Sequence, residues 1–286
     1  MALKLAYETW GEGPHPLLLV HGFTGNRTSF DHLRPLWSEH VRAIAVELPG
    51  HGGTRLPTRT GRDGFLETLE ALFRVLDELN VARTNVLGYS QGARFALAAV
   101  LSRPERFSRF IMESGSPGLH RRTARAERRS KDGELALFLR QKGLMAFMDY
   151  WEALPLFRGL SDIPPEWREA LRARRLGNTA EGLAGALECL GLGVQPDYWP
   201  ELHRQRLPTL LLTGGLDEKF TLTAKRMAEE LPVVWRRTFE GCTHAPHLEV
   251  PGEYAREVLS FLQTPWYEAP EFEEPSRDED AAGGHG

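Results

Sequence analysis

Residues Gly88–Gly92 read Gly-Tyr-Ser-Gln-Gly, a spacing that could hold a reactive serine hydroxyl at a sharp turn. An apolar, strand-like run (Val86–Leu87) leads into the turn, and a helical pattern (Ala93–Leu101) follows it. In this setting Gly-x-Ser-x-Gly predicts a nucleophile elbow, a strand-to-helix turn that presents Ser90 above the end of a parallel sheet. The two glycines allow the tight bend and the close approach of neighbouring elements. The alternative is a serine in an ordinary strand-to-helix turn.

A serine hydroxyl needs a base within hydrogen-bonding reach and an acid that orients this base. Asp217 is the favoured acid because it lies in a Gly-rich turn after a strand-like run. Glu218 is the alternative, although an acid at that position suits the start of a helix. His244 is the favoured base because it follows the last predicted strand and its loop, and His247 remains the alternative.

A second Gly-rich loop could stabilise a developing negative charge. The apolar run Pro16–Val20 ends in His21-Gly22-Phe23-Thr24-Gly25. In an enzyme with an elbow serine, a loop at this point supplies the second backbone amide of the oxyanion hole. The alternative is a plain Gly-rich loop between a strand and a helix.

These residues must be positioned by alternating strands and helices, which indicates an α/β fold with a mostly parallel, doubly wound sheet. The predicted strands are Leu3–Glu8, Pro16–Val20, Val41–Leu48, the run before the elbow, Phe107–Glu113, Leu207–Thr213 and Val233–Phe239. The predicted helices are Asp31–Glu39, Gly64–Leu79, Ala93–Leu101, Thr221–Leu231 and Gly252–Gln263.

The strand pattern is interrupted once, which divides the chain into three parts. Residues 119–203 contain no strand-like run and are helical in composition, so we expect an inserted cap over the site. Residues 1–118 and 204–264 would form the core, and residues 265–286 an acidic, disordered tail. Seven acids and one arginine give this tail a charge of −6, which leaves +2 on the rest of a chain whose net charge is −4.

Composition excludes several classes of protein. The near-neutral charge gives no reason to expect a nucleic-acid partner. No apolar run reaches about 18 residues, so no membrane span is expected. The N-terminal residues show no signal-peptide pattern, and two distant cysteines in 286 residues favour the reducing cytoplasm over a disulfide framework. No metal-ligating spacing occurs, so we expect no metal.

Arginines are concentrated in the predicted cap. Residues 121–131 hold five arginines and a lysine, and Arg172, Arg174 and Arg175 form a second group. Most are expected to be solvated. A cap over a neutral ester would nevertheless be apolar, and the guanidinium group matches a carboxylate bidentately, so the cap indicates a small-molecule polycarboxylate ligand. Trp151, Phe157 and Trp167 would form apolar walls of the site or pack inside the cap.

Together the elbow, His21–Phe23, Asp217 and His244 resemble the α/β-hydrolase family. Further stretches resemble the MenH family, the 2-succinyl-6-hydroxy-2,4-cyclohexadiene-1-carboxylate (SHCHC) synthases of menaquinone biosynthesis. These stretches are Leu48–Gly53, Gly88–Arg94, Pro117–Leu119, Arg125–Arg128, Trp151 with Pro155–Phe157, Val194–Asp197 and Asp217–Phe220. The resemblance extends from about residue 3 to residue 263 and includes the predicted cap.

The resemblance implies roles for individual residues. Ser90, Asp217 and His244 would form the catalytic triad, and the amides of Phe23 and Gln91 the oxyanion hole. The substrate-binding residues would be Tyr89, Arg94, Arg128, Trp151, Phe157 and Arg175. Two positions depart from the family pattern, since Ala93 and Thr243 stand where it usually has glycine.

The implied activity is elimination of pyruvate from 2-succinyl-5-enolpyruvyl-6-hydroxy-3-cyclohexene-1-carboxylate (SEPHCHC), a tricarboxylate. Ser90 would remove the proton α to the succinyl carbonyl, and no metal or organic cofactor is required. A serine carboxylesterase or carbon–carbon bond hydrolase on the same fold is the alternative, and a non-catalytic binding protein is a further one. The sequence indicates no oligomeric state.

Overall fold

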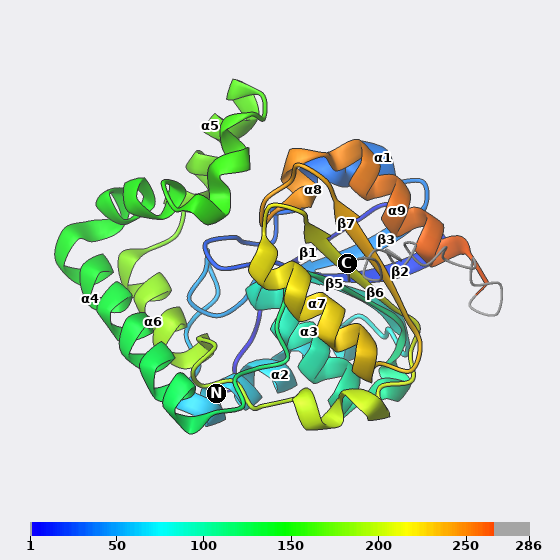
Figure 1. Ribbon diagram of the computed structural model, residues 1–286, viewed down its shortest axis with the longest axis horizontal. Helices are drawn as coiled ribbons and strands as arrows, with labels where there is room; N and C mark the ends of the chain where they lie inside the picture. Colours follow the sequence, from blue (N-terminus) through cyan, green and yellow to red (C-terminus); the bar gives the residue numbers. More distant parts are fainter. Residues whose placement is uncertain (1, 266–286) are drawn as a thin grey trace, which may run out of the picture.

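Seven strands form one sheet in the computed structural model, which describes residues 2–265 (Figure 1). The strand order is β1-β3-β2-β4-β5-β6-β7; β1 runs antiparallel to β3, and every other neighbouring pair is parallel. The strands are β1 (Tyr7–Trp10), β2 (His15–Val20), β3 (Val41–Val46), β4 (Thr84–Tyr89), β5 (Phe107–Glu113), β6 (Thr209–Gly214) and β7 (Val234–Phe239). The predicted α/β fold class, with its mostly parallel sheet, is confirmed.

Helices cover both faces of this sheet. The α-helices are α1 (Arg34–Trp37), α2 (Gly61–Glu78), α3 (Gln91–Ser102), α4 (Arg122–Glu152), α5 (Pro165–Leu176), α6 (Ala180–Leu190), α7 (Glu218–Glu230), α8 (Pro246–Glu249) and α9 (Pro251–Gln263). The 3₁₀ helices are η1 (Asp31–Leu33), η2 (Pro104–Arg106), η3 (Pro155–Ser161) and η4 (Trp199–Arg204).

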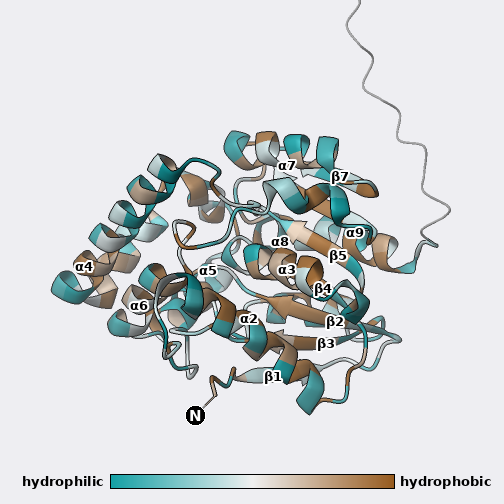
Figure 2. Cartoon of the chain, turned by 90° about the horizontal axis from the view of Figure 1, so that it is seen from below, coloured by the Kyte–Doolittle hydropathy of each residue, from teal (hydrophilic) through white to brown (hydrophobic). Residues whose placement is uncertain are grey.

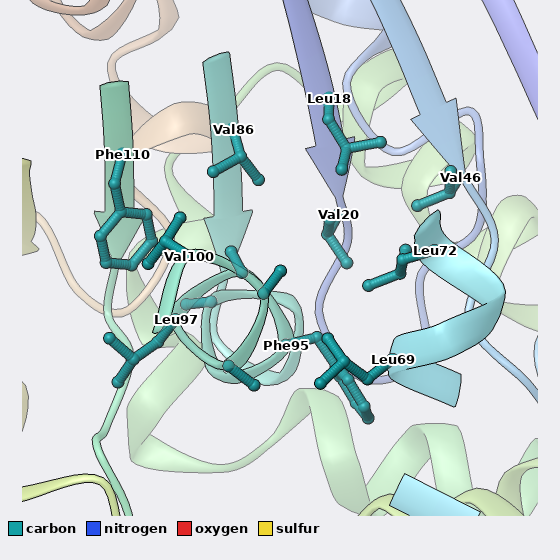
Figure 3. Close-up of a cluster of buried hydrophobic side chains, with 14 of the residues drawn as sticks. Leu18, Val20, Val46, Leu69, Leu72, Val86, Phe95, Leu97, Val100 and Phe110 are labelled. Carbon is teal, nitrogen blue, oxygen red and sulfur yellow. The ribbon is translucent and has the colours of Figure 1, made fainter. Parts of the chain in front are cut away.

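Alternate residues of each central strand serve two separate cores. Leu18 and Val20 of β2 point to one face, where they meet α2 and α3, and Figure 3 shows this cluster around Phe95 of α3. Leu17 and Leu19 point to the other face, where α1 and α9 pack. Since both faces are buried, these strands are continuous apolar runs, as expected for a parallel sheet.

Helices α4, α5 and α6 lie together beside the sheet, outside its helical layers (Figure 1). Helix α4 packs on α6, and α6 also contacts α2. Helix α4 is broken at Gly143, whose φ of 80° is left-handed. In Figure 2 the central strands are largely hydrophobic, whereas α4 alternates hydrophilic and hydrophobic residues because its inner face packs against α6. Within residues 119–203 the described structure contains helices and no strand.

Two predicted elements differ from the observed ones. The first strand was expected at Leu3–Glu8 but spans Tyr7–Trp10, because Leu3 and Leu5 fill a hydrophobic core without pairing in the sheet. The predicted helix Asp31–Glu39 is a 3₁₀ turn followed by the short helix α1. The predicted tail falls, except for Pro265, outside the described residues. Among residues 2–265 no helix has both the length and the apolar character needed to span a membrane.

Substitution of the elbow glycine tests how tightly the fold holds the serine. A Cβ on Gly92 would lie 2.0 Å from the Val20 carbonyl oxygen, so α3 would have to move away from β2. We expect Gly92→Ala to lower the free energy of unfolding by about 2 kcal/mol or more in urea titrations. Gly133→Ala in α4 is the control, because a Cβ there meets nothing within 4 Å, and it should raise stability by up to about 1 kcal/mol. Equal effects of the two substitutions would contradict the close approach at Gly92.

Candidate active site

Ser90 lies at the turn between β4 and α3. Its φ of 51° is unusual for a residue with a side chain, and its amide donates a hydrogen bond to the Glu113 carbonyl at 2.8 Å. The turn is closed by Gly88, whose Cβ would lie 2.5 Å from the Gly92 carbonyl oxygen. The strained turn therefore directs the Ser90 side chain out of the sheet, at the carboxyl ends of the strands.

A hydrogen-bonded chain joins Ser90 to a buried base and a buried acid. His244 Nε2 lies 2.9 Å from Ser90 Oγ, and His244 Nδ1 lies 2.6 Å from Asp217 Oδ2. In this arrangement Nδ1–H donates to the carboxylate, which leaves Nε2 free to accept the serine proton. His244 is 2 % exposed and Asp217 6 % exposed, so water is kept from the pair.

The two alternative residues are engaged elsewhere. His247 Nδ1 lies 2.8 Å from Glu113 Oε1, and its ring packs edge-on against Tyr89 with centroids 4.5 Å apart. Glu218 is the first residue of α7, where an acid favours the helix dipole. The geometry thus groups His244 and Asp217, rather than these two, with the serine.

Two backbone amides are available beside the serine hydroxyl. Among the described residues no group accepts a hydrogen bond from the Phe23 amide. The Gln91 amide is the first of helix α3, where no intrahelical acceptor exists. Gly22 lets the Phe23 loop approach β4, since a Cβ there would lie 2.7 Å from the Tyr89 ring. Both residues line the cavity above Ser90.

His21 holds the start of this loop as a neutral imidazole. Its Nε2 accepts a hydrogen bond from the Leu48 amide at 3.0 Å, and its Nδ1 lies 2.7 Å from the Gly22 carbonyl oxygen. A backbone amide can donate only to an unprotonated nitrogen, so the proton must sit on Nδ1. Burial and the neighbouring His51 hold the pKa of His21 well below its usual value.

His51 holds the next peptide of the loop in the same way. Its Nε2 accepts a hydrogen bond from the Thr24 amide at 3.3 Å, and its Nδ1 lies 3.0 Å from the Pro49 carbonyl oxygen. Thr24 has a φ of 69°, which is costly for a β-branched residue, and Asn178 also donates to its carbonyl. Burial lowers the pKa of His51 to about 4. The loop is thus fixed by two uncharged histidines.

A cavity of about 150 Å³ opens above Ser90. It is lined by nine of the eleven residues that the sequence singled out, namely Phe23, Tyr89, Ser90, Gln91, Arg94, Arg128, Trp151, Phe157 and His244. Asp217 lies behind His244, and Arg175 is elsewhere. The sequence analysis missed Ser116, Leu156, Leu187, Gly191, Leu192, Lys219 and Phe220, which complete the wall. Lys219 could have been identified as a candidate because it lies two residues after Asp217, at the end of the sheet that holds the site.

Cations reach the cavity from three elements. Arg94 of α3 is 8 % exposed; burial, followed by the nearby Arg128, lowers its pKa to about 9. Arg128 of α4 bonds the buried carboxylate of Asp132 through its Nε at 2.9 Å. Lys219 of α7 is the third cation on the wall. The cavity wall is therefore positively charged.

Arg175 does not line the cavity above Ser90, although it shares a small pocket of about 30 Å³ with Phe23, Tyr89 and Phe157. Its Nη1 is 3.1 Å from Glu152 Oε1, and its guanidinium group sits 5.5 Å from the centre of the Phe157 ring. It lines a separate cavity of about 410 Å³ between η3 and α5. In this structure Arg175 is not brought together with Arg94 and Arg128.

Of the predicted aromatic wall residues, Trp151 and Phe157 line the cavity above Ser90 and Trp167 does not. Trp151 stacks on Phe147 with ring centroids 5.6 Å apart and meets Phe23 edge-on. Its Nε1 is buried without a hydrogen-bond partner. Trp167, which the sequence offered as a further wall, is 37 % exposed on α5 and does not line this cavity.

Comparisons with known proteins agree on one superfamily. The model of the alpha/beta hydrolase family matches residues 17–257. A putative 2-succinyl-6-hydroxy-2,4-cyclohexadiene-1-carboxylate synthase of Bacillus subtilis (strain 168) is 33% identical over 90% of this chain and 94% of its own length. A synthase of the same name from Salmonella typhimurium is 32% identical over 88% of this chain and 95% of its own length. The solved structure of MenH from S. aureus has a TM-score of 0.84 and 31% identity, covering 90% of this chain and 97% of the other.

The neutral histidines predict a loss of stability in acid. The unfolded chain takes up a proton on His51 below pH 6.5, whereas the folded protein resists it until about pH 4, so stability is full above pH 6.5 and falls between these values. We expect His51→Gln, which cannot be protonated, to reduce this loss by up to about 3 kcal/mol in urea titrations from pH 7 to pH 4. His203→Gln, at an exposed histidine, should leave it unchanged. An unaltered pH slope in His51→Gln would refute the role of His51.

Proposed function

The chain belongs to the alpha/beta hydrolase family, and we propose that within it the protein is an SHCHC synthase that eliminates pyruvate from SEPHCHC. The observation that carries the proposal is the opening of the Ser90–His244–Asp217 chain into a small cavity that also holds three cations. Relatives that bear this enzyme name match about nine-tenths of the chain, the 119–203 segment included.

The proposed mechanism uses Ser90 as a base. Its hydroxyl proton passes to His244 Nε2, 2.9 Å away, while Asp217 stabilises the imidazolium that forms. The serine oxygen then takes the ring proton α to the succinyl carbonyl. The C–H electrons form a new double bond, the existing ring double bond shifts, and the bond from ring carbon to enolpyruvyl oxygen breaks. The leaving group takes up a proton and becomes pyruvate, so no water is consumed.

The amides of Phe23 and Gln91 would lower the barrier to this proton transfer. Removal of the proton places negative charge on the succinyl carbonyl oxygen, and the amides of Phe23 and Gln91 would donate to that oxygen. Because the donors are already held in place, they stabilise the charge without reorganisation, the usual source of most of the rate enhancement in such sites.

The organisation of the chain follows from the same proposal. Residues 1–118 and 204–264 would be the hydrolase core and residues 119–203 its cap, which supplies Arg128, Trp151 and Phe157 to the cavity. Arg175 would bind substrate only after its ion pair with Glu152 opens. The two free, buried cysteines support a place in the reducing cytoplasm.

Turnover of SEPHCHC tests the proposal directly. Purified protein should release one pyruvate per substrate, measured by coupled lactate dehydrogenase, and Ser90→Ala should lower kcat by about a hundredfold to ten-thousandfold, the usual contribution of a positioned base. A protein that releases no pyruvate yet hydrolyses p-nitrophenyl esters would instead be a carboxylesterase on the same fold.

Removal of one cation tests the assignment of substrate class. Arg128→Met should raise KM for SEPHCHC about tenfold or more, through the loss of a charge-assisted hydrogen bond, and leave p-nitrophenyl acetate turnover unchanged. Lys142→Met, at an exposed lysine on the same helix, should alter neither.

A second variant separates binding from folding. Arg128→Met leaves the buried Asp132 carboxylate without its partner, and the double variant Arg128→Met/Asp132→Asn removes that charge. The double variant should recover stability but keep the raised KM. Recovery of KM together with stability would mean that Arg128 has only a structural role.

A further inference from the structure

Lys219 stands at the active-site cavity without a role in the chemistry so far described. It is the second residue of α7, it lines the cavity with Ser90 and His244, and its ammonium group lies 5.1 Å from the centre of the Phe220 ring. The ring contact fixes the side chain against the wall by a cation–π interaction.

The charges around Lys219 leave its ammonium group available to an anionic ligand. Burial, followed by the positive charge of Arg128, lowers its pKa; Asp217 acts in the opposite direction, and Lys131 adds to the lowering. The Asp217 carboxylate is already bonded to His244 and to the start of α7. Within residues 2–265 no carboxylate forms an ion pair with Lys219, whereas Arg128 has Asp132. Lys219 is exposed overall but lines the cavity, so its ammonium group is open to a carboxylate of a bound ligand.

Arg175 is not available as a third cation in the cavity above Ser90 in this structure. Each carboxylate of a tricarboxylate can be matched by a cation, but Arg175 is bonded to Glu152 and does not line the cavity above Ser90. The cations that share the cavity with Ser90 are Arg94, Arg128 and Lys219. They come from three separate helices, α3, α4 and α7.

We propose that Lys219 is the third carboxylate contact of this site and a determinant of its specificity for tricarboxylate substrates. The inference rests on the proposed function for the identity of the substrate. Its ammonium group would pair with the carboxylate nearest α7, while Arg94 and Arg128 would hold the other two.

Kinetics of a charge-removing variant test the proposal. Lys219→Met keeps the length of the side chain, and KM for SEPHCHC should rise about tenfold to a hundredfold while kcat changes less than about threefold. Lys219→Arg should restore most of the affinity. Lys225→Met, at an exposed lysine of the same helix, should behave as the wild type.

Other outcomes would overturn the proposal. If Lys219 acted instead by stabilising the charge of Asp217, Lys219→Met would lower kcat on both SEPHCHC and p-nitrophenyl acetate and would shift the pH profile of kcat. An unchanged KM, or an equal loss on both substrates, refutes a carboxylate contact.

A binding measurement separates this proposal from the proposed function. Calorimetry with propane-1,2,3-tricarboxylate needs no turnover, and wild type should bind at least about tenfold more tightly than Lys219→Met. That result, without pyruvate release from SEPHCHC, would keep the carboxylate contact and refute the synthase. Equal binding by both proteins would refute the contact, whatever the activity. If wild type bound no tricarboxylate and released no pyruvate, both proposals would fail.

Discussion

The close approach of α3 to β2 is the contact on which the rest of the site depends. With no side chain at Gly92, the first turn of the helix rests on the Val20 carbonyl, and the chain must turn sharply at Ser90 to enter it. This one turn brings the serine oxygen, the Gln91 amide and the Phe23 loop to the same end of the sheet. Any displacement of α3 would move Ser90 and the Gln91 amide relative to the Phe23 loop, which follows β2.

Asp217 and His244 lie close to Ser90 because the carboxyl ends of parallel strands meet at the same edge of the sheet. Asp217 follows β6 and His244 follows β7, so two residues 27 positions apart meet over β4 at hydrogen-bonding distance. On the opposite side the Phe23 loop is held by two neutral histidines rather than by charges. Uncharged supports leave the electrostatic potential above Ser90 to the triad and to the cations of the cavity.

Sequence patterns were sufficient to predict those residues whose place in the fold follows from the order of strands along the chain. The continuous apolar runs indicated the buried strands, and Ser90, Asp217 and His244 could be grouped because each follows a strand of one sheet. The same patterns could not show side-chain direction within the inserted helices. Arg175 and Arg128 look alike in sequence, but Arg175 pairs with Glu152 and Arg128 enters the cavity. Lys219 was missed because its place on the cavity wall depends on how the first turn of α7 faces α3 and α4, which no local pattern records.

The cations of the cavity come from both parts of the molecule, since Arg94 and Lys219 lie on core helices and only Arg128 lies on α4. Under the proposed function, selectivity is therefore not a transferable property of the inserted helices. A chimera that grafts residues 119–203 onto another hydrolase core would inherit one of three anion contacts. A change of substrate would accordingly require substitutions both in residues 119–203 and in α3 or α7.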